Sequence, residues 1–156
     1  MIVRRATKAD LSRIAEIHSV SFRTDWVHDH DSFRWISSKF ASVPFNTYYV
    51  AETDVGVIGY ILWAECGGVR SNAVLELEQI AVAPEHRAVG TATELILESL
   101  AQVESNIGDR HIKLIKVTTG TTNAAQRLYK RTICATPVCV IQDLYDGDEV
   151  IMISRR

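Results

Sequence analysis

The amino-acid sequence predicts one mixed α/β (α+β) domain that spans residues 1–156. A length of 156 residues with a hydrophobic content of 47% suffices for one sizeable core. The chain is too short for two domains to be expected. Segments rich in β-forming residues and segments of helical periodicity follow one another in the order β-α-α-β-β-β-α-β-α-β-β. This order departs from a regular βαβ winding, so the central sheet should be mixed rather than all parallel.

The first half of the chain should form one strand, two helices and three further strands. Asp10 is expected to cap the first helix, which ends near Phe22. The second helix gains its apolar face from Phe33, Ile36 and Phe40. The strands are expected at residues 2–5, 47–52, 57–64 and 73–82. The second and third of these strands should pair antiparallel.

The second half begins with a helix after Pro84, and the apolar face of this helix comprises Ala92, Ile96, Leu100 and Val103. Residues 111–117 form a nearly continuous apolar run with the aliphatic stems of its lysines, which is typical of a central strand covered by helices. The remaining elements are a short helix at 123–131 and a final strand pair at 137–145 and 149–154. The Asp-Gly-Asp sequence at 146–148 should form the turn of that pair.

The composition restricts the class of partner and the expected location. A formal net charge of -2 offers no basic surface for nucleic acid or for an anionic membrane. The chain has neither the roughly 18 consecutive apolar residues of a membrane span nor the apolar run of a signal peptide, so a cytoplasmic location is expected. Cys66, Cys134 and Cys139 form no C-x-x-C pair, so we expect buried apolar side chains rather than disulfides or a zinc site.

The polarity pattern of the strand at 73–82 breaks in its middle. Strict alternation would place two carboxylates and two core side chains on one face, namely Glu76, Glu78, Ile80 and Val82. A β-bulge near Glu78 and Gln79 would resolve this conflict. The bulge would leave backbone groups of residues 80–82 unpaired, where an extended ligand with amide groups, such as pantetheine, could bond to them.

The segment after Pro84 has the composition of a phosphate-binding turn. Small residues and one arginine lead into the next helix, in the order Arg87, Ala88, Val89, Gly90, Thr91 and Ala92. Gly90 would let phosphate oxygens approach the backbone, and the helix N-terminus and Arg87 would add positive charge. Neither a G-x-x-x-x-G-K-[ST] loop nor a G-x-G-x-x-G turn is present, which disfavours nucleoside-triphosphate and dinucleotide binding.

Two motifs carry a family resemblance. The pattern R-x-x-G-x-A at 87–92, preceded by V-x-P at 82–84, resembles the coenzyme-A motif of the GNAT acetyltransferase family. Residues 123–129, Asn-Ala-Ala-Gln-Arg-Leu-Tyr, are similar to the family's second signature, an asparagine that opens a short helix ending in Leu-Tyr. The resemblance implies a GNAT-like, mostly antiparallel central sheet flanked by helices. It also implies an acyltransferase that uses acetyl-coenzyme A to acetylate a primary amine by direct transfer in a ternary complex.

The resemblance further implies roles for individual residues. Glu78 or Glu76 would be the general base, and Tyr129 would protonate the departing thiolate. The alternatives are a solvated strand face for the glutamates and a packed core ring for the tyrosine. The cosubstrate acetyl-CoA would contact Ile80, Ala81, Val82, Arg87, Ala88, Val89, Gly90, Thr91, Ala92 and Asn123.

The acceptor pocket is expected between the first two helices, where this family shapes it. The candidate residues there are Phe22, Asp25, Trp26 and His28. A carboxylate beside aromatic faces suits a cationic or aromatic amine, and plain packing is the alternative. The acceptor would be a small-molecule or peptide amine. The sequence leaves open whether the chain forms a homodimer. The His and Asp residues at 28–31 are expected to form a solvated loop rather than a metal site.

The sequence departs from the family pattern after the second signature. Ile133 and Cys134 stand where relatives usually have Gly-Phe, and a β-branched residue is a poor left-handed cap. A different helix end would displace Tyr129. This departure keeps open an alternative function, a non-catalytic acyl-CoA-binding sensor or regulatory module of the same fold. A further alternative is an unrelated α/β ligand-binding module.

Overall fold

The structure is a computed structural model that describes residues 1–22, 29–68 and 70–156. The described residues form strands β1 (Ile2–Arg5), β2 (Asn46–Thr53), β3 (Gly56–Cys66), β4 (Asn72–Val82), β5 (His111–Gly120), β6 (Thr136–Ile141) and β7 (Glu149–Arg155). They also form helices α1 (Leu11–Ser21), α2 (Asp29–Phe40), α3 (Thr91–Asn106) and α4 (Ala125–Ile133), and short 3-10 turns η1 (Lys8–Asp10) and η2 (Pro84–His86). The predicted order of strands and helices is confirmed.

The strands belong to a seven-stranded, mostly antiparallel sheet in the order β1-β2-β3-β4-β5-β7-β6, and helices flank this sheet. β1 pairs antiparallel with β2, and β7 pairs antiparallel with both β5 and β6. β4 pairs parallel with β5, and the connection between them contains α3. The predicted fold class, a mixed sheet flanked by helices, is therefore confirmed.

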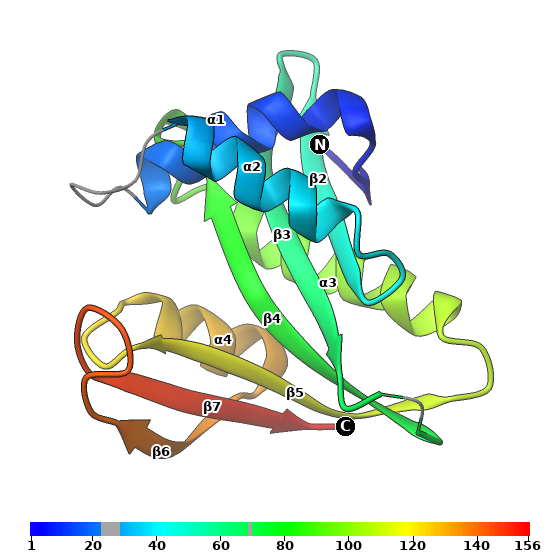
Figure 1. Ribbon diagram of the computed structural model, residues 1–156, viewed down its shortest axis with the longest axis vertical. Coiled ribbons are helices and arrows are strands. Elements are labelled where there is room, and N and C mark those ends of the chain that lie inside the picture. Colours follow the sequence, from blue (N-terminus) through cyan, green and yellow to red (C-terminus); the bar gives the residue numbers. More distant parts are fainter. Residues whose placement is uncertain (23–28, 69) are drawn as a thin grey trace. The chain divides into compact units, whose positions relative to one another are not determined.

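The chain divides into two compact units, each built from two separate segments. Unit 1 comprises Met1–Trp63 and Gln79–Gln102, and unit 2 comprises Ala64–Glu78 and Val103–Arg156. In unit 1, α1 and α2 lie side by side (Figure 1). In unit 2, β5, β7 and β6 run next to one another (Figure 1).

The core of unit 1 is aliphatic and aromatic. Its most buried members are Ile14, Ile17, Ile36, Tyr48, Val50, Tyr60 and Leu62, together with Ala81 and Ala83. On α2 the buried side chains are Ser32 and Ile36, whereas Phe33 is 41% exposed. The expected apolar face of this helix is therefore wrong at Phe33, because the buried stripe follows residues 32 and 36, one turn apart.

A close approach of two backbones fixes the position of β4 against β3. A Cβ atom added at Gly59 would lie 3.0 Å from the carbonyl oxygen of Ala81 and 3.2 Å from the Leu95 side chain. The N–H of Ala83 donates to the carbonyl of Ile58 at 2.9 Å. Glycine at position 59 is therefore required by packing rather than by its backbone angles.

An ion cluster ties the N-terminal strand to its neighbours. The guanidinium of Arg4 on β1 donates to both carboxylate oxygens of Asp10, each at 2.9 Å, and to both oxygens of Glu52 on β2, at 2.7 and 3.1 Å. Asp10 also accepts from the N–H and hydroxyl of Thr7. Asp10 is the N-cap residue of α1, as predicted, but its side chain makes no capping hydrogen bond to this helix, because Arg4 and Thr7 occupy its oxygens.

In unit 2 one face of the sheet is buried and the edge strand is open. Leu75, Ile115, Val117 and Met152 are buried in adjacent strands. All six residues of β6 are exposed, as is Cys134. Cys66 is half-buried, and Cys139 is exposed because it lies on the edge strand β6. The expectation that the cysteines are buried is therefore wrong.

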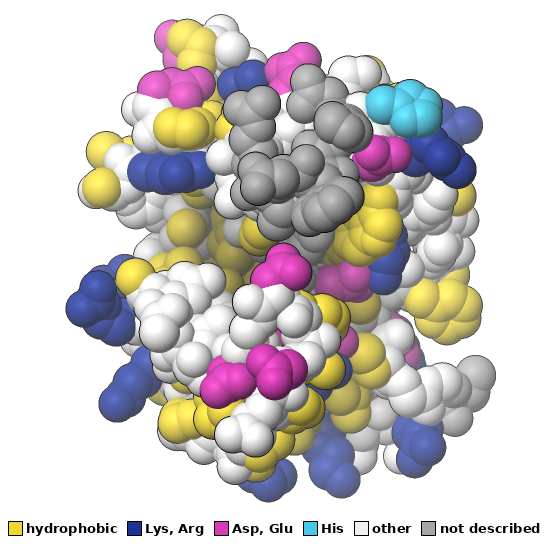
Figure 2. Space-filling view, turned by 60° about the vertical axis from the view of Figure 1, so that its left-hand side comes forward, with side chains coloured by type: hydrophobic (Ala, Val, Ile, Leu, Met, Phe, Trp, Pro, Cys, Tyr) yellow, Lys and Arg dark blue, Asp and Glu magenta, His cyan; other side chains and the backbone are white. Residues whose placement is uncertain are grey.

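The final strand pair also differs from the prediction. β6 ends at Ile141, opposite Glu149, so residues 142–148 form a loop rather than the strand end and short turn expected. Asp143 in this loop has a positive φ of 47°. Acidic side chains are visible among hydrophobic ones on the surface drawn in Figure 2.

The Arg4 cluster generates a prediction for stability. The hydrogen bonds from Arg4 lower the pKa of Asp10 from 3.8 to about 2, against the opposing effect of burial. Asp10 therefore stabilises the fold above pH ~4, and this contribution is lost as the pH falls from about 4 towards 2. We expect Asp10→Asn to lower the free energy of unfolding at pH 7 by roughly 1–3 kcal/mol in urea denaturation.

The control is Asp54→Asn, which removes an exposed carboxylate from the turn between β2 and β3. The difference in the free energy of unfolding between Asp10→Asn and Asp54→Asn should shrink when the measurement is repeated at pH 3. Equal stability of the two variants at pH 7 would contradict the role assigned to Asp10.

Candidate active site

The C-terminal part of β4 lies in unit 1 and has two different edges. The Ala83 N–H donates to Ile58, and the Ala81 carbonyl faces Gly59, so the odd-numbered residues bond towards β3. Because successive residues of a strand direct their N–H and C=O groups to opposite sides, Ile80 and Val82 direct theirs to the other edge. The pairing of that edge with β5 ends at Leu77, opposite Val117.

Burial along β4 changes where the sequence pattern breaks. Buried and half-buried residues alternate from Ala73 to Glu78, after which Gln79 and Ile80 are both half-buried and residues 81–82 are both buried. The register shift recorded in the pairing with β5 lies between Ala73 and Val74. The β4–β5 pairing ends at Leu77, so it does not reach residues 78–79 and the bulge expected there stays a prediction; the backbone of Ile80 lies beyond the last β4–β5 pair.

The turn from β4 into α3 bends through two left-handed residues, Ala88 with φ 64° and Gly90 with φ 97°. The carbonyl of Gly90 accepts from the N–H groups of Thr93 and Glu94, so α3 begins directly after it. The N–H groups of Thr91 and Ala92 belong to the first helical turn and have no intrahelical acceptor. A Cβ placed at Gly90 would meet nothing within 4 Å, so the backbone there is open to a ligand.

Arg87 is held by its own unit. Its Nε donates to the carbonyl of Val82 at 2.8 Å, and its Nη2 donates to the hydroxyl of Ser21 at 3.0 Å. Two of its nitrogens therefore brace the turn against β4 and α1. This positions the guanidinium beside the start of α3, with Nη1 as the nitrogen for which no bond is recorded in the described residues.

The two glutamates of β4 lie in unit 2 and are half-buried on either side of the buried Leu77, so strand alternation places them on one face. Oε2 of Glu76 lies 2.9 Å from Nζ of Lys116, its register partner on β5. Burial opposes the charge on Lys116, but the hydrogen bond and charge of Glu76 raise its pKa. The thiol of Cys66 also lies 3.7 Å from Glu76 Oε2, and burial together with the charge of Glu76 raises the pKa of this thiol.

Asn123 stands before α4 in unit 2 and organises the start of this helix. Its Oδ1 accepts from the N–H of Ala125 at 2.9 Å, and the side chain is exposed. The amide of Gln126 donates to the carbonyls of Gly120 and Thr121. The helix therefore begins after residue 124, two residues later than predicted, and Asn123 caps it from outside.

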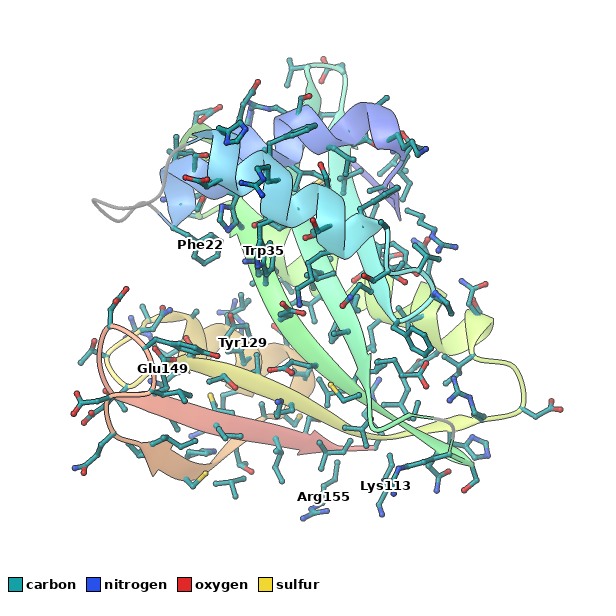
Figure 3. The ribbon with its side chains drawn as sticks, viewed as in Figure 1. Phe22, Trp35, Lys113, Tyr129, Glu149 and Arg155 are labelled. Atoms are coloured by element: carbon teal, nitrogen blue, oxygen red, sulfur yellow. The ribbon has the colours of Figure 1, made fainter. Side chains whose placement is uncertain are left out.

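Tyr129 lies on α4, in unit 2 (Figure 3). Its side chain is buried, and burial raises its pKa to about 12. α4 ends with Ile133 buried and Cys134 in the left-handed conformation at φ 55°, whose N–H bonds back to the carbonyl of Tyr129. The expected obstacle at the helix end is therefore avoided, because the left-handed position falls on the unbranched Cys134.

Of the residues expected to line the acceptor pocket, Phe22 follows α1 and is 40% exposed. Asp25, Trp26 and His28 lie outside the described residues. The predicted site residues thus fall into both units. Unit 1 contains Phe22 and the residues 80–92, and unit 2 contains Glu76, Glu78, Asn123 and Tyr129.

A polar chain in unit 1 was missed by the sequence argument. The imidazole of His18 on α1 lies 3.0 Å from the hydroxyl of Ser32 on α2 and 3.2 Å from the amide nitrogen of Gln79 on β4. The hydroxyl of Tyr60 on β3 donates to the other end of that amide, at 3.1 Å. Position 18 stood out only as a polar residue among apolar residues of helical spacing, which is a weak signal.

The described part of the chain contains no helix long and apolar enough to span a membrane. Within the same residues, no three His, Cys, Asp or Glu side chains are grouped so that they could hold a metal ion.

Comparison with known proteins places this geometry in a family. The chain matches the Acetyltransferase (GNAT) family over residues 11–133. It is 28% identical to an uncharacterized N-acetyltransferase of Methanocaldococcus jannaschii, over 100% of this chain and 92% of the relative.

Solved structures share the fold. A ribosomal-protein-alanine N-acetyltransferase from Brucella melitensis superposes with a TM-score of 0.76 at 17% identity, covering 100% of both chains. A chain of the NatC complex, solved with Gag peptide and CoA bound, superposes with a TM-score of 0.74 at 15% identity, covering 99% of this chain and 98% of that one. Members of the GNAT family use acetyl-CoA as a cosubstrate. The family match covers most of the chain, and the described fold agrees with it, so the chain belongs to the Acetyltransferase (GNAT) family.

Proposed function

We propose that the chain is an N-acetyltransferase that moves the acetyl group of acetyl-CoA to a primary amine by direct transfer in a ternary complex. The observation that carries the proposal is the open backbone of unit 1, formed by the outer edge of β4 and the turn at Gly90. An uncovered strand edge followed by a helix N-terminus fits a ligand that joins an amide-bearing arm to a pyrophosphate.

The residues present fit the two parts of coenzyme A. Gly90 leaves open space beside the free N–H groups of Thr91 and Ala92, where phosphate oxygens would be bonded and would face the positive end of α3. Ile80 would bond pantetheine amides through its backbone, which is directed away from β3. The Val82 carbonyl already accepts from Arg87, so Arg87 chiefly holds the turn, and we assign it a secondary role in phosphate binding.

The amine nitrogen bonds to the thioester carbonyl carbon, and the carbon–sulfur bond breaks. A protonated amine loses two protons in total, one before the attack and one as the amide forms. In the net balance the sulfur gains one of them, and the other is released to solvent. An alkyl amine of pKa ~10 is mainly protonated at neutral pH, so a carboxylate must accept a proton before attack. We propose Glu78 for this task. Glu76, whose carboxylate lies 2.9 Å from the ammonium of Lys116, is the second candidate, and the two are separated by the variants below.

Tyr129 is proposed as the group that donates to the departing sulfur. With its pKa raised to about 12, the phenol keeps its proton throughout the neutral and mildly alkaline range. Complete transfer to an alkyl thiolate of pKa ~8.5 would be uphill by roughly 3.5 units, or ~5 kcal/mol. The raised pKa therefore favours a hydrogen bond that strengthens as charge develops on sulfur, followed by protonation from solvent.

Left-handed Cys134 caps α4 after Ile133, so the helix that carries Tyr129 continues past the second signature despite the Ile133-Cys134 departure. This observation supports the enzyme over the acyl-CoA sensor considered from the sequence.

Gly90→Glu tests the cofactor site. The variant places bulk and negative charge beside the proposed phosphates, so CoA affinity measured by calorimetry should fall at least about 100-fold. The positive φ adds backbone strain of roughly 1 kcal/mol, which the control Gly56→Glu shares, because Gly56 has a φ of 101° and open space around it. The cofactor site assigned here is refuted if both variants bind CoA as the wild type does.

Glu78→Gln tests the base. In a thiol-release assay with a panel of primary amines, this variant should lower kcat roughly 100-fold at pH 7 and recover partly towards pH 9, where more of the amine is neutral. The matched variant Glu76→Gln should lower kcat less than about tenfold. A larger loss in Glu76→Gln than in Glu78→Gln would reverse the assignment.

Tyr129→Phe tests the donor to sulfur. The variant keeps the buried ring and removes one oxygen, so CoA affinity should stay within about twofold while kcat falls roughly 100-fold. Tyr145→Phe is the control, because Tyr145 is 71% exposed in the loop after β6. A kcat within about threefold of wild type in Tyr129→Phe would show that the ring only packs.

A further inference from the structure

The chain of hydrogen bonds around His18 has a defined direction. The hydroxyl of Tyr60 donates to Oε1 of Gln79, so the Gln79 amide nitrogen faces Nε2 of His18 and donates to it. An imidazole that accepts at Nε2 carries its proton on Nδ1 when neutral, and Nδ1 lies 3.0 Å from the hydroxyl of Ser32. Every partner is then matched by a neutral His18 in one tautomer.

The burial of this cluster agrees with a neutral imidazole. Burial lowers the pKa of His18, and burial also raises the pKa of Tyr60. A second proton on His18 would set an N–H against the N–H of Gln79. The bonds from α2, β3 and β4 thus hold the imidazole in one orientation.

The rings of two aromatic side chains, Phe22 and Trp35, both lie close to this fixed imidazole. The ring of Phe22 lies 5.0 Å from His18 at a tilt of 38°, and the ring of Trp35 lies 6.1 Å away, stacked at 24°. Both rings remain partly open to solvent, at 40% and 38% exposure. Figure 3 shows Phe22 and Trp35 on the same side of the α1–α2 pair.

The cluster is joined to the strand proposed to bind pantetheine. Gln79 immediately precedes Ile80 on β4 and lies three residues from Val82. At about 3.3 Å per residue, Gln79, which holds His18, lies roughly 10 Å along the strand from Val82, where β4 ends and the turn proposed to bind pyrophosphate follows. This is the direction in which the pantetheine arm would run towards its thioester.

The charges around the cluster restrict what it can bind. Nζ of Lys39 lies 5.0 Å from the ring centroid of Trp35, so a second cation at this ring would be repelled. The recorded partners of His18 are a hydroxyl, an amide and two aromatic rings. Such a surface favours a flat apolar group over a polycation.

We propose that Phe22, His18 and Trp35 form the acceptor subsite and select primary amines that carry an aromatic ring. The ring of the acceptor would pack against Phe22 and Trp35 and direct its amine towards the thioester. His18 is a positioning residue, because it orients both rings and is itself held by Gln79 and Ser32. This inference rests on the acetyltransferase function proposed above.

The test compares two amines of similar basicity, phenylethylamine and propylamine, in a thiol-release assay with acetyl-CoA. The wild type should use phenylethylamine with a kcat/KM at least about tenfold higher. Trp35→Ala should raise KM for phenylethylamine about tenfold or more and bring the ratio close to 1, with KM for acetyl-CoA unchanged. His18→Ala should have the same effect on KM and a smaller effect on kcat.

The control is Phe33→Ala, because Phe33 lies on the same helix with a similar exposure of 41% and has no recorded ring contact with His18. This variant should keep the wild-type ratio. Equal use of both amines, use of neither, or equal loss in Trp35→Ala and Phe33→Ala would overturn the subsite. If the wild type binds CoA but shows one of these outcomes, the proposed acetyltransferase function stands and only the aromatic subsite is refuted. If the wild type does not bind CoA, both the function and the subsite are refuted.

Discussion

The candidate site depends on how β4 is held against β3. Gly59 lets the carbonyl of Ala81 approach the backbone of β3, and the bond from Ala83 to Ile58 secures the same edge. Strand geometry then directs the N–H and C=O groups of Ile80 to the opposite edge. Any side chain at position 59 would force β4 away and move the backbone on which the proposed pantetheine contacts rely.

The turn after β4 extends this constraint to α3. Arg87 connects Val82 to Ser21 on α1, so the loop that contains Gly90 is fixed at both ends within unit 1. In unit 2, Lys116 binds the carboxylate of Glu76 and holds it beside β5.

Local patterns predicted most of the fold, because periodicity, turn composition and the two signatures depend on residues close in sequence. The errors concern side-chain partners and strand positions that helical or strand periodicity does not encode. Asp10 stands at the N-cap of α1, but its carboxylate bonds to Arg4 and Thr7 rather than to α1, and Cys139 is exposed because β6 is an edge strand. The contact between His18 and Gln79 joins residues 61 positions apart, so no local pattern could reveal it. The role of each predicted site residue remains a prediction.

The central claim is that the outer edge of β4 and the first turn of α3 bind coenzyme A. Amide hydrogen exchange, followed by mass spectrometry with and without CoA, tests it directly. We expect slower exchange in peptides covering residues 80–82 and 90–92 when CoA is bound, and unchanged exchange in β1 and β2. Unchanged exchange in both of the first two segments at saturating CoA would contradict the account.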